Sequence, residues 1–247
     1  MTLKEFFTEN NNAALGFSGG VDSSYLLYVA KKYGANIKPY FIKTRFQPEF
    51  ELLDAQKIAE LLNIKLTIIH HDILENDRVA ANKKDRCYHC KTALFGLLKK
   101  IAVEDGFSVL LDGTNASDDE GDRPGMRAIA ELSVLSPLKI CGITKDEVRE
   151  LSKKAGLFTW DKPSYSCLAT RISADEVITK DILYKIENAE NSLFKLGYSD
   201  FRIRASGKIA RLQMPNAQFE KIINQKDIIH QELSKYFDSV LLDLKPR

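Results

Sequence analysis

Short apolar runs alternate with amphipathic stretches along the first half of the chain. The apolar runs predict β-strands at residues 13–18, 37–43, 65–71 and 107–113. The amphipathic stretches carry apolar side chains at helical spacing and end in glycine or asparagine, which predicts helices at residues 22–34, 49–63 and 91–106. Strands and helices that alternate in this way predict an α/β fold with a doubly wound parallel sheet, in which ligands bind at the carboxyl ends of the strands.

The pattern changes towards the C-terminus. Residues 144–157 open with a Thr-x-x-Glu capping box and predict a further helix. The next expected elements are a long polar helix and two short strands that turn at Ser206-Gly207, at residues 179–196, 200–205 and 208–214. We therefore predict a large domain at residues 1–172 and a small C-terminal α+β domain at residues 173–247.

Composition and charge narrow the class of protein. The 36 basic and 34 acidic residues of the 247-residue chain leave a formal net charge of +2, so no global field favours nucleic acid or membrane as a partner. The N-terminus has no basic segment followed by an apolar core, and no run approaches the roughly 18 apolar residues of a spanning helix. We expect a cytoplasmic protein whose four cysteines are thiols or ligands rather than a disulfide framework.

The string GFSGGVDSS joins the first predicted strand to the first predicted helix. At such a junction the backbone N–H groups and the helix dipole favour an anion, and glycines let a phosphate approach the backbone. Serine hydroxyls add donors, and an aspartate can cap the helix or meet a magnesium ion. The residues expected to hold phosphate are Ser18, Gly19, Gly20, Asp22, Ser23 and Ser24. A Walker loop would add a lysine that is missing here, and a tight strand-to-helix turn is the alternative.

This string resembles the Ser-Gly-Gly-x-Asp-Ser loop of the PP-loop ATP pyrophosphatase superfamily. The resemblance implies an adenine-nucleotide α-hydrolase-like fold and an enzyme that cuts ATP between the α and β phosphates. AMP would be placed on an oxygen of the substrate, and nitrogen or sulfur would then attack the activated carbonyl. ATP and magnesium are the expected cofactors.

Polar residues also follow the second and fourth predicted strands. Thr44 lies in FIKTR, and Asp112, Gly113, Thr114 and Asn115 lie in LLDGTNASDD. Because the carboxyl ends of parallel strands meet at one edge of a sheet, we expect these residues near the nucleotide. The alternative is ordinary loop chemistry, in which these residue types are common.

Two cysteines in RCYHCK have the C-x-x-C spacing of a zinc or iron–sulfur half-site or of a redox dithiol. Cys87 and Cys90 flank His89, but the chain has no second C-x-x-C, and Cys141 and Cys167 stand alone. We therefore favour structural thiols at the start of a helix and predict no metal site. Cys141 is expected to pack as a small hydrophobe.

The stretch SYSCLATRI gives Cys167 a different setting. Lys162 precedes it and Arg171 follows it by four residues, and nearby positive charge raises the thiolate fraction of a cysteine. A lone cysteine more commonly has an ordinary packing role, so the residue by itself leaves its chemistry open.

A set of motifs in order resembles the LarE-type sacrificial sulfur transferases, which are PP-loop proteins. The motifs are GFSGGVDSSYL, RCYHCKTALF, DGTNASDDEGDRPGMRA, KPSYSCLATRI and FRIRASGKIARL, and they cover about residues 13 to 214. In that family, ATP adenylates a carboxylate of pyridinium-3,5-biscarboxylic acid mononucleotide, the precursor of the nickel-pincer cofactor of lactate racemase. A cysteine displaces AMP, and cleavage of its Cβ–S bond leaves a thiocarboxylate on the product and dehydroalanine in the chain.

The resemblance also assigns individual residues. The sulfur-donating cysteine falls on Cys167, and Arg202 and Arg204 match a pair associated with the substrate phosphate, for which a guanidinium fork is suited. Arg171 and Glu190 match residues near the same substrate. A solvated helix face and a charged strand face are the alternatives for Glu190 and the arginine pair.

One position departs from the family pattern. Gln213 stands where an acid is expected after the second of the two strands, which removes a charge and puts any metal or acid role there in doubt.

Several alternatives stay open from the sequence. Cys87, Cys90 and Cys167 are enough for an iron–sulfur cluster that would carry the transferred sulfide, although this is not favoured. A tRNA thiolation enzyme, a PP-loop amidotransferase and an ATP-binding regulator are rival functions. We expect a small-molecule pyridinium mononucleotide substrate, no nucleic acid, and no membrane. The resemblance further implies a homo-oligomer, assembled through the C-terminal substrate-binding domain, and a nickel-insertion protein as a pathway partner.

Overall fold

The computed structural model describes residues 1–118 and 124–247, which divide into two compact units. The first unit consists of Met1–Ile73 and Asp85–Lys162. The second consists of Leu74–Lys84 and Pro163–Arg247, so an internal segment of the first half packs with the C-terminal residues. The predicted domain boundary at residue 172 stays a prediction.

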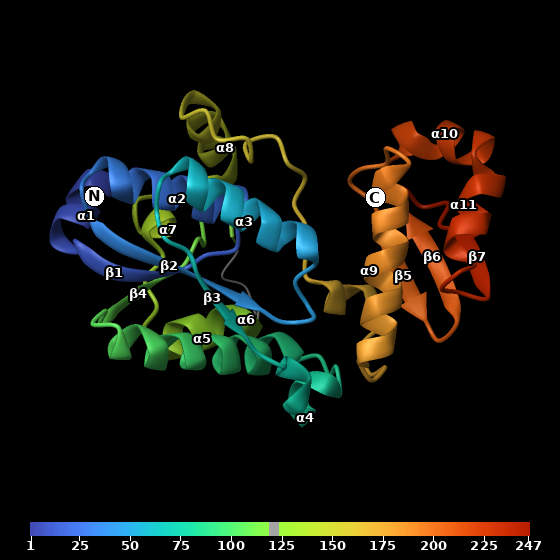
Figure 1. Ribbon diagram of the computed structural model, residues 1–247, viewed down its shortest axis with the longest axis horizontal. Coiled ribbons are helices and arrows are strands. Elements are labelled where there is room, and N and C mark those ends of the chain that lie inside the picture. The colour runs from blue at the N-terminus through green and yellow to red at the C-terminus, as the bar shows by residue number, and fades with distance from the viewer. Residues whose placement is uncertain (119–123) are drawn as a thin grey trace. The chain divides into compact units, whose positions relative to one another are not determined.

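The first unit contains a four-stranded parallel sheet in the order β3-β2-β1-β4 (Figure 1). Its strands are β1 (Asn12–Gly16), β2 (Asn36–Lys43), β3 (Thr67–His70) and β4 (Val109–Leu111). All four lie within the predicted apolar runs or start one residue before them. The predicted parallel α/β sheet is therefore confirmed.

Helices connect these strands and cover the sheet. They are α1 (Leu3–Glu9), α2 (Val21–Lys32), α3 (Glu49–Leu61), α5 (Arg86–Glu104), α6 (Pro124–Glu131), α7 (Pro137–Ile140) and α8 (Lys145–Lys154). Both halves of the predicted capping box form at the start of α8, between Thr144 and Glu147. Helix α5 begins at Arg86 rather than at Lys91, so the C-x-x-C pair lies inside its first turns.

Alternating residues of the central strand β1 face two separate cores. Ala13 and Leu15 belong to the core shared with α1, α2, α3, α7 and α8, whereas Ala14 belongs to the core shared with α5 and α6. Figure 1 shows these two groups of helices on opposite faces of the sheet. Because both faces are covered, the strands are almost continuously apolar, as their sequence indicated.

The second unit is a small α+β structure. It contains α4 (Asp77–Ala80), α9 (Lys180–Lys195), α10 (Phe219–Asn224), α11 (Lys226–Leu233) and a three-stranded sheet of β5 (Arg202–Ser206), β6 (Ile209–Gln213) and β7 (Ser239–Leu242). The two predicted strands are confirmed as β5 and β6, which pair antiparallel, and Gly207 in the turn between them has a φ of 53°. The sequence analysis missed β7, which pairs parallel to β6.

Three short 3-10 turns complete the described structure: η1 (Ile73–Glu75), η2 (Leu168–Arg171) and η3 (Asn216–Gln218). None of the helices within the described ranges has the length and apolar character needed to cross a membrane.

Candidate functional site

The loop between β1 and α2 is shaped by a glycine that no other residue can replace without strain. Gly19 has a φ of 72°, and a Cβ atom built on it would lie 2.8 Å from the backbone nitrogen of Ala55 in α3. Both the left-handed conformation and the contact with α3 therefore require glycine. Gly20 then occupies the N-cap of α2, where no described side chain caps the first N–H groups of the helix.

The loop hydroxyls form a small network around the start of α2. The Ser18 N–H donates to Oγ of Ser23 over 3.3 Å, the two Oγ atoms lie 3.1 Å apart, and Ser23 Oγ donates to the Gly20 carbonyl over 3.3 Å. Ser24 behaves differently, because its side chain is 0% exposed and its Oγ has no hydrogen-bond partner among the described residues. The Ser23 hydroxyl thus takes part in the loop network, whereas the Ser24 hydroxyl is buried without a contact to that network.

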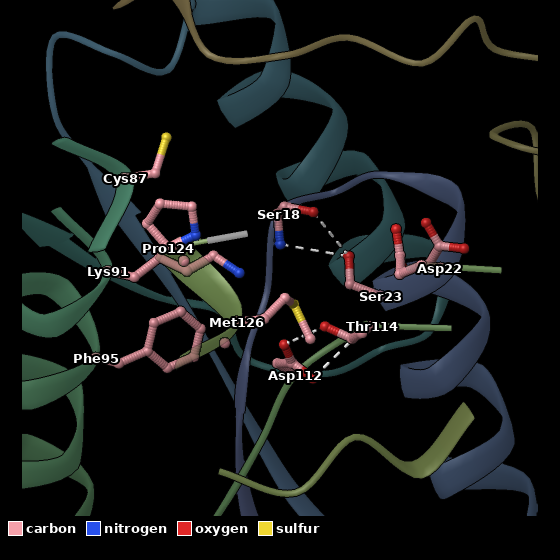
Figure 2. Close-up of a pocket in the computed structure, with 14 residues that line it drawn as sticks. Ser18, Asp22, Ser23, Cys87, Lys91, Phe95, Asp112, Thr114, Pro124 and Met126 are labelled. Carbon is pink, nitrogen blue, oxygen red and sulfur yellow. Dashed lines mark hydrogen bonds between the residues drawn. The ribbon is translucent and has the colours of Figure 1, made fainter. Parts of the chain in front are cut away.

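A pocket of about 490 Å³ opens beside this loop, at the carboxyl edge of the sheet. Ser18, Asp22, Ser23, Gly113 and Thr114 line it, which brings five of the predicted ATP-binding residues together (Figure 2). Pockets of 300–1,000 Å³ are typical for small-molecule ligands. The pocket therefore has the volume of a small-molecule site, and several of the side chains that line it are polar.

Asp112 ties the end of β4 to its surroundings in this pocket. Its carboxylate accepts hydrogen bonds from Oγ of Ser136 over 2.6 Å and from Oγ1 of Thr114 over 2.5 Å. The next residue, Gly113, lies so close to α2 that a Cβ atom there would be 3.1 Å from the Ser23 nitrogen. These contacts fix the strand end against the phosphate loop.

Asp22 is held by groups from two distant segments. Nδ2 of Asn115 donates to its Oδ1 over 3.2 Å, and Lys145 at the start of α8 forms an ion pair with its Oδ2. The Lys145 N–H also donates to Oγ of Ser117 over 2.9 Å. Asn115 therefore supports Asp22 rather than lining the pocket itself.

Thr44 lies apart from the pocket lining. Its side chain is buried, donates to Oε1 of Gln47 over 2.7 Å and accepts from the Phe46 N–H over 3.0 Å. These contacts stabilise the turn after β2. Residues 119–123, which belong to one of the family motifs, lie outside the described residues.

Helix α5 contributes three pocket residues that the sequence analysis did not assign to the nucleotide. Cys87, Lys91 and Phe95 are spaced i, i+4 and i+8, which places them on one helix face, and all three line the pocket. Figure 2 shows the Lys91 amino group pointing into the pocket. Lys91 can therefore supply the cation that the loop itself lacks. The i+4 spacing of these residues was the sequence signal that could have placed them on one helix face.

The cysteines form no disulfide among themselves in the described structure. No group of three or more His, Cys, Asp and Glu residues in the described ranges is arranged to hold a metal ion. Cys87 is exposed at the pocket, whereas Cys141 packs against the first core, and burial raises the pKa of its thiol.

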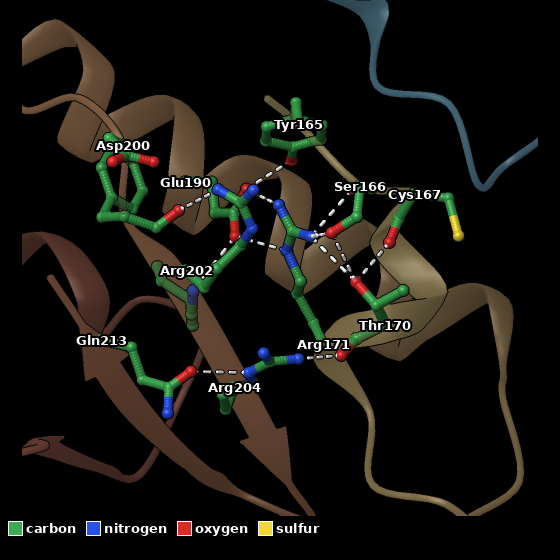
Figure 3. Close-up of polar contacts among 12 residues, drawn as sticks. Tyr165, Ser166, Cys167, Thr170, Arg171, Glu190, Asp200, Arg202, Arg204 and Gln213 are labelled. Atoms are coloured by element: carbon green, nitrogen blue, oxygen red, sulfur yellow. Dashed lines mark hydrogen bonds and ion pairs between the residues drawn. The ribbon is translucent and has the colours of Figure 1, made fainter. Parts of the chain in front are cut away.

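In the second unit, Cys167 immediately precedes η2 and is partly exposed. A dense polar cluster lies beside it, in which Arg171 and Glu190 form an ion pair with 2.9 Å between Nε and Oε1 (Figure 3). Each of these two residues is 1% exposed. Burial alone would lower the pKa of Arg171, but the hydrogen bonds and charge of Glu190 offset burial and raise it.

The two arginines of β5 differ in their surroundings. Arg202 is 4% exposed, and burial together with the charge of Arg171 lowers its pKa to about 10. Arg204 is half-buried and donates through Nε to Oε1 of Gln213 over 2.8 Å. Nε2 of Gln213 donates onward to Oδ2 of Asp243 over 3.0 Å. This neutral glutamine therefore bridges Arg204 to a carboxylate and does not itself neutralise the charge of Arg204.

Comparisons with known proteins give similarities of different extent. The family model for asparagine synthase matches residues 9–118, which contain the phosphate loop. An uncharacterized protein of Synechocystis sp. is 35% identical over 98% of this chain and 92% of its own length. Pyridinium-3,5-bisthiocarboxylic acid mononucleotide synthase of Lactiplantibacillus plantarum is 28% identical over 98% of this chain and 89% of its own length.

A tRNA-specific 2-thiouridylase of Pseudothermotoga lettingae is also similar. It is 29% identical over 59% of this chain and 52% of its own length. The similarity to the synthase thus extends through both units, whereas the similarity to the thiouridylase covers little more than half of the chain.

Proposed function

Because this chain belongs to the LarE-type sulfur transferases of the PP-loop ATP pyrophosphatase superfamily, we propose that it converts a carboxylate of pyridinium-3,5-biscarboxylic acid mononucleotide into a thiocarboxylate. The chain is an adenylating sulfur transferase, and the proposal concerns its substrate and its sulfur source. The observation that carries the proposal is the similarity to the Lactiplantibacillus synthase over 98% of the chain, which includes Cys167. The product would serve the nickel-pincer cofactor of lactate racemase.

The first step takes place in the pocket at the phosphate loop. A substrate carboxylate oxygen attacks the α-phosphorus of ATP, an acyl adenylate forms, and pyrophosphate leaves. The N-terminus of α2, the hydroxyls of Ser18 and Ser23, and the Lys91 ammonium support this step, because they stabilise negative charge on the departing pyrophosphate.

The pocket also suits a magnesium ion that arrives with ATP. Mg²⁺ is usually held by one or two carboxylates together with substrate phosphates. Asp22 and Asp118 line the pocket and can provide those carboxylates, while phosphate oxygens would complete the coordination. Bound Mg²⁺ would neutralise part of the phosphate charge.

The second step uses Cys167. Its thiolate attacks the acyl carbon, the C–O bond to AMP breaks, and a thioester joins the substrate to the chain. Removal of the Cys167 α-proton then expels the thiocarboxylate with the electron pair of the Cβ–Sγ bond, and dehydroalanine remains. The chain loses the elements of hydrogen sulfide, so each molecule would act once.

Arg204 is the residue best suited to hold the phosphate of the mononucleotide. Its Nε contacts the neutral Gln213 where the family pattern expects an acid, so the positive charge of Arg204 is not cancelled at that contact. A phosphate favours such a guanidinium fork. The same resemblance supports a homo-oligomer and transfer of the product to a nickel-inserting partner.

Intact-protein mass spectrometry tests the proposed sulfur source. The protein is incubated with ATP, magnesium and the biscarboxylic acid mononucleotide, and we expect its mass to fall by that of hydrogen sulfide, with the change mapped to residue 167. The Cys167→Ala variant should release pyrophosphate but yield no thiocarboxylate, whereas Cys141→Ser should behave as wild type. Thiolated product with an unchanged chain mass would contradict the sacrificial route and favour a cluster-bound sulfide.

The similarity to a tRNA thiouridylase supports one rival substrate. A parallel reaction with tRNA in place of the mononucleotide distinguishes the two. Pyrophosphate release and sulfur incorporation that depend on tRNA, and not on the mononucleotide, would contradict our proposal.

A further inference from the structure

In the second unit, most of the side chains predicted to bind the substrate instead contact other groups of the protein. We propose that Arg171, Arg202 and Glu190 are positioning residues that fix the backbone around Cys167 and do not themselves bind the substrate. The inference rests on the proposed role of Cys167 as the sulfur donor. It leaves Arg204 as the substrate-phosphate ligand.

Glu190 is the buried centre of this arrangement. It accepts hydrogen bonds from Nε of Arg171 over 2.9 Å, from Nη2 of Arg171 over 3.2 Å, and from the Ile203 N–H over 3.0 Å. The Tyr165 hydroxyl also donates to it. Both carboxylate oxygens are thus occupied by protein donors, and a 1% exposed side chain offers no surface to a ligand. The role of Glu190 is to hold Arg171 in place.

Arg171, held in place by Glu190, in turn donates hydrogen bonds to residues before and after Cys167. Its Nη1 donates to the Ser166 carbonyl over 2.8 Å, to Ser166 Oγ over 2.9 Å and to Thr170 Oγ1 over 3.0 Å. Thr170 in turn donates to the Cys167 carbonyl, from Oγ1 over 2.8 Å and from its N–H over 3.0 Å. The cysteine backbone is therefore held by contacts of Ser166, which precedes it, and of Thr170, three residues after it.

Arg202 anchors the same segment from β5. Its Nη2 donates to the Ser164 carbonyl over 2.6 Å, and its Nη1 donates to the Phe201 carbonyl over 2.7 Å. Arg204 also donates to the Thr170 carbonyl. Guanidinium donors from η2 and β5 thus bind backbone carbonyls at both ends of the segment 164–170.

The aromatic ring of Tyr165 packs against two of these cations. The guanidinium carbon lies 4.3 Å from the ring centroid for Arg171 and 5.1 Å for Arg202. A buried charge is costly unless it is paired and fully hydrogen-bonded, and the cluster buries two cations with a single carboxylate between them. This cost is consistent with a structural role of the cluster in holding residues 164–170. It is less consistent with substrate binding, which requires side chains that are accessible from solvent.

Figure 3 shows the consequence for the thiol. The Cys167 carbonyl faces Thr170, whereas its sulfur atom points away from the arginine cluster. A nucleophile that must meet an acyl carbon benefits from a fixed backbone, because its approach then requires little further ordering.

Two conservative variants test this inference in the full-length protein. Thr170→Val removes the hydroxyl bond to the Cys167 carbonyl at nearly constant volume, and Arg202→Lys replaces two fixed donors with one flexible amine. We expect substrate-dependent ATP–pyrophosphate exchange to stay within about two-fold of wild type in both, while single-turnover sulfur transfer falls on the order of 10- to 100-fold. Ser206→Ala, which removes an exposed hydroxyl of the same unit, is the matched control and should change neither rate.

Hydrogen exchange supplies a readout that does not depend on the substrate. Both variants should speed amide exchange within residues 164–170 while the Tm and the exchange of β6 stay near wild type. An Arg202→Lys variant that raises the substrate concentration for half-maximal pyrophosphate exchange ten-fold would overturn the inference and restore a substrate-binding role. Unchanged sulfur transfer in Thr170→Val would also overturn it. A wild-type chain that never loses sulfur from Cys167 would instead refute the proposed function, whatever the exchange data show.

Discussion

Asn115 donates a hydrogen bond to Asp22 beside the phosphate loop, with 3.2 Å between Nδ2 of the amide and Oδ1 of the carboxylate. The contact joins the segment after β4 to the first turn of α2, and Lys145 of α8 pairs with the other carboxylate oxygen. Three parts of the chain that are distant in sequence are thus gathered around one acid. Asp22 is therefore the residue where loss of a single charge should have the largest effect on the pocket.

The first prediction concerns that charge. Asp22→Asn keeps the shape of the side chain but removes its charge, which should weaken both the Lys145 ion pair and binding of magnesium. We expect pyrophosphate release to fall about 100-fold, the usual consequence of losing one preorganised electrostatic group. Asp146→Asn, an exposed acid beside Lys145, is the control and should retain wild-type activity. A fully active Asp22→Asn variant would contradict the role of this carboxylate.

The second prediction concerns the lysine that α5 places in the pocket. Lys91→Met preserves the length of the side chain and removes its cation, so the contact with ATP phosphates should be lost. A hydrogen bond to a charged group contributes about 1.5–3 kcal/mol, which corresponds to roughly a 10- to 100-fold rise in the ATP dissociation constant. Lys100→Met changes an exposed lysine of the same helix and should leave affinity unchanged. Isothermal titration with a non-hydrolysable ATP analogue measures both.

The third prediction separates two adjacent serines. Ser23→Ala should weaken ATP binding because it removes a pocket hydroxyl. Ser24→Ala should leave ATP binding intact and raise the free energy of unfolding by about 1 kcal/mol, because it removes a buried hydroxyl that has no hydrogen-bond partner among the described residues. Loss of ATP affinity in Ser24→Ala, measured together with its urea unfolding curve, would show that this hydroxyl reaches the nucleotide after all.

Ser23 and Ser24 illustrate which structural features could be predicted from the sequence and which could not. The alternation of strands and helices is a strong periodic signal, so the sheet, its direction and the position of the phosphate loop could be predicted. Which of two neighbouring serines faces the pocket depends on the rotation of α2 by about 100° per residue, and that is set by packing against the sheet. Sequence spacing leaves this rotation undetermined.

The polar cluster of the second unit shows the same limit of prediction from sequence. Glu190 lies on a helix that is rich in polar residues, where a solvated side chain is the ordinary expectation. Its burial follows from pairing with Arg171, 19 residues away, and with the backbone of Ile203. Such pairings depend on how α9, η2 and β5 pack together, which no local pattern encodes. The strand β7 was missed although its run SVLL at residues 239–242 repeats the letters of the predicted run at residues 107–113.

The last prediction tests the shape of the phosphate loop with two glycines that share one backbone conformation. Gly19 and Gly34 have φ values of 72° and 75°, so alanine at either position is strained by roughly 1–2 kcal/mol. They differ in space, because a Cβ at Gly19 would lie 2.8 Å from the Ala55 nitrogen, whereas a Cβ at Gly34 would meet nothing within 4 Å. Gly34→Ala should therefore lower the Tm by about 2–8 °C and preserve ATP affinity.

Gly19→Ala carries the same backbone strain and must also move the loop away from α3. We expect it to lose at least about ten-fold in ATP affinity, because displacement of the loop separates its N–H groups from the phosphates they are placed to bind. Measuring Tm and ATP affinity for both variants separates conformational strain from loop displacement. Equal losses of affinity in the two variants would show that general destabilisation is responsible, and wild-type affinity in Gly19→Ala would show that the loop does not hold the phosphates.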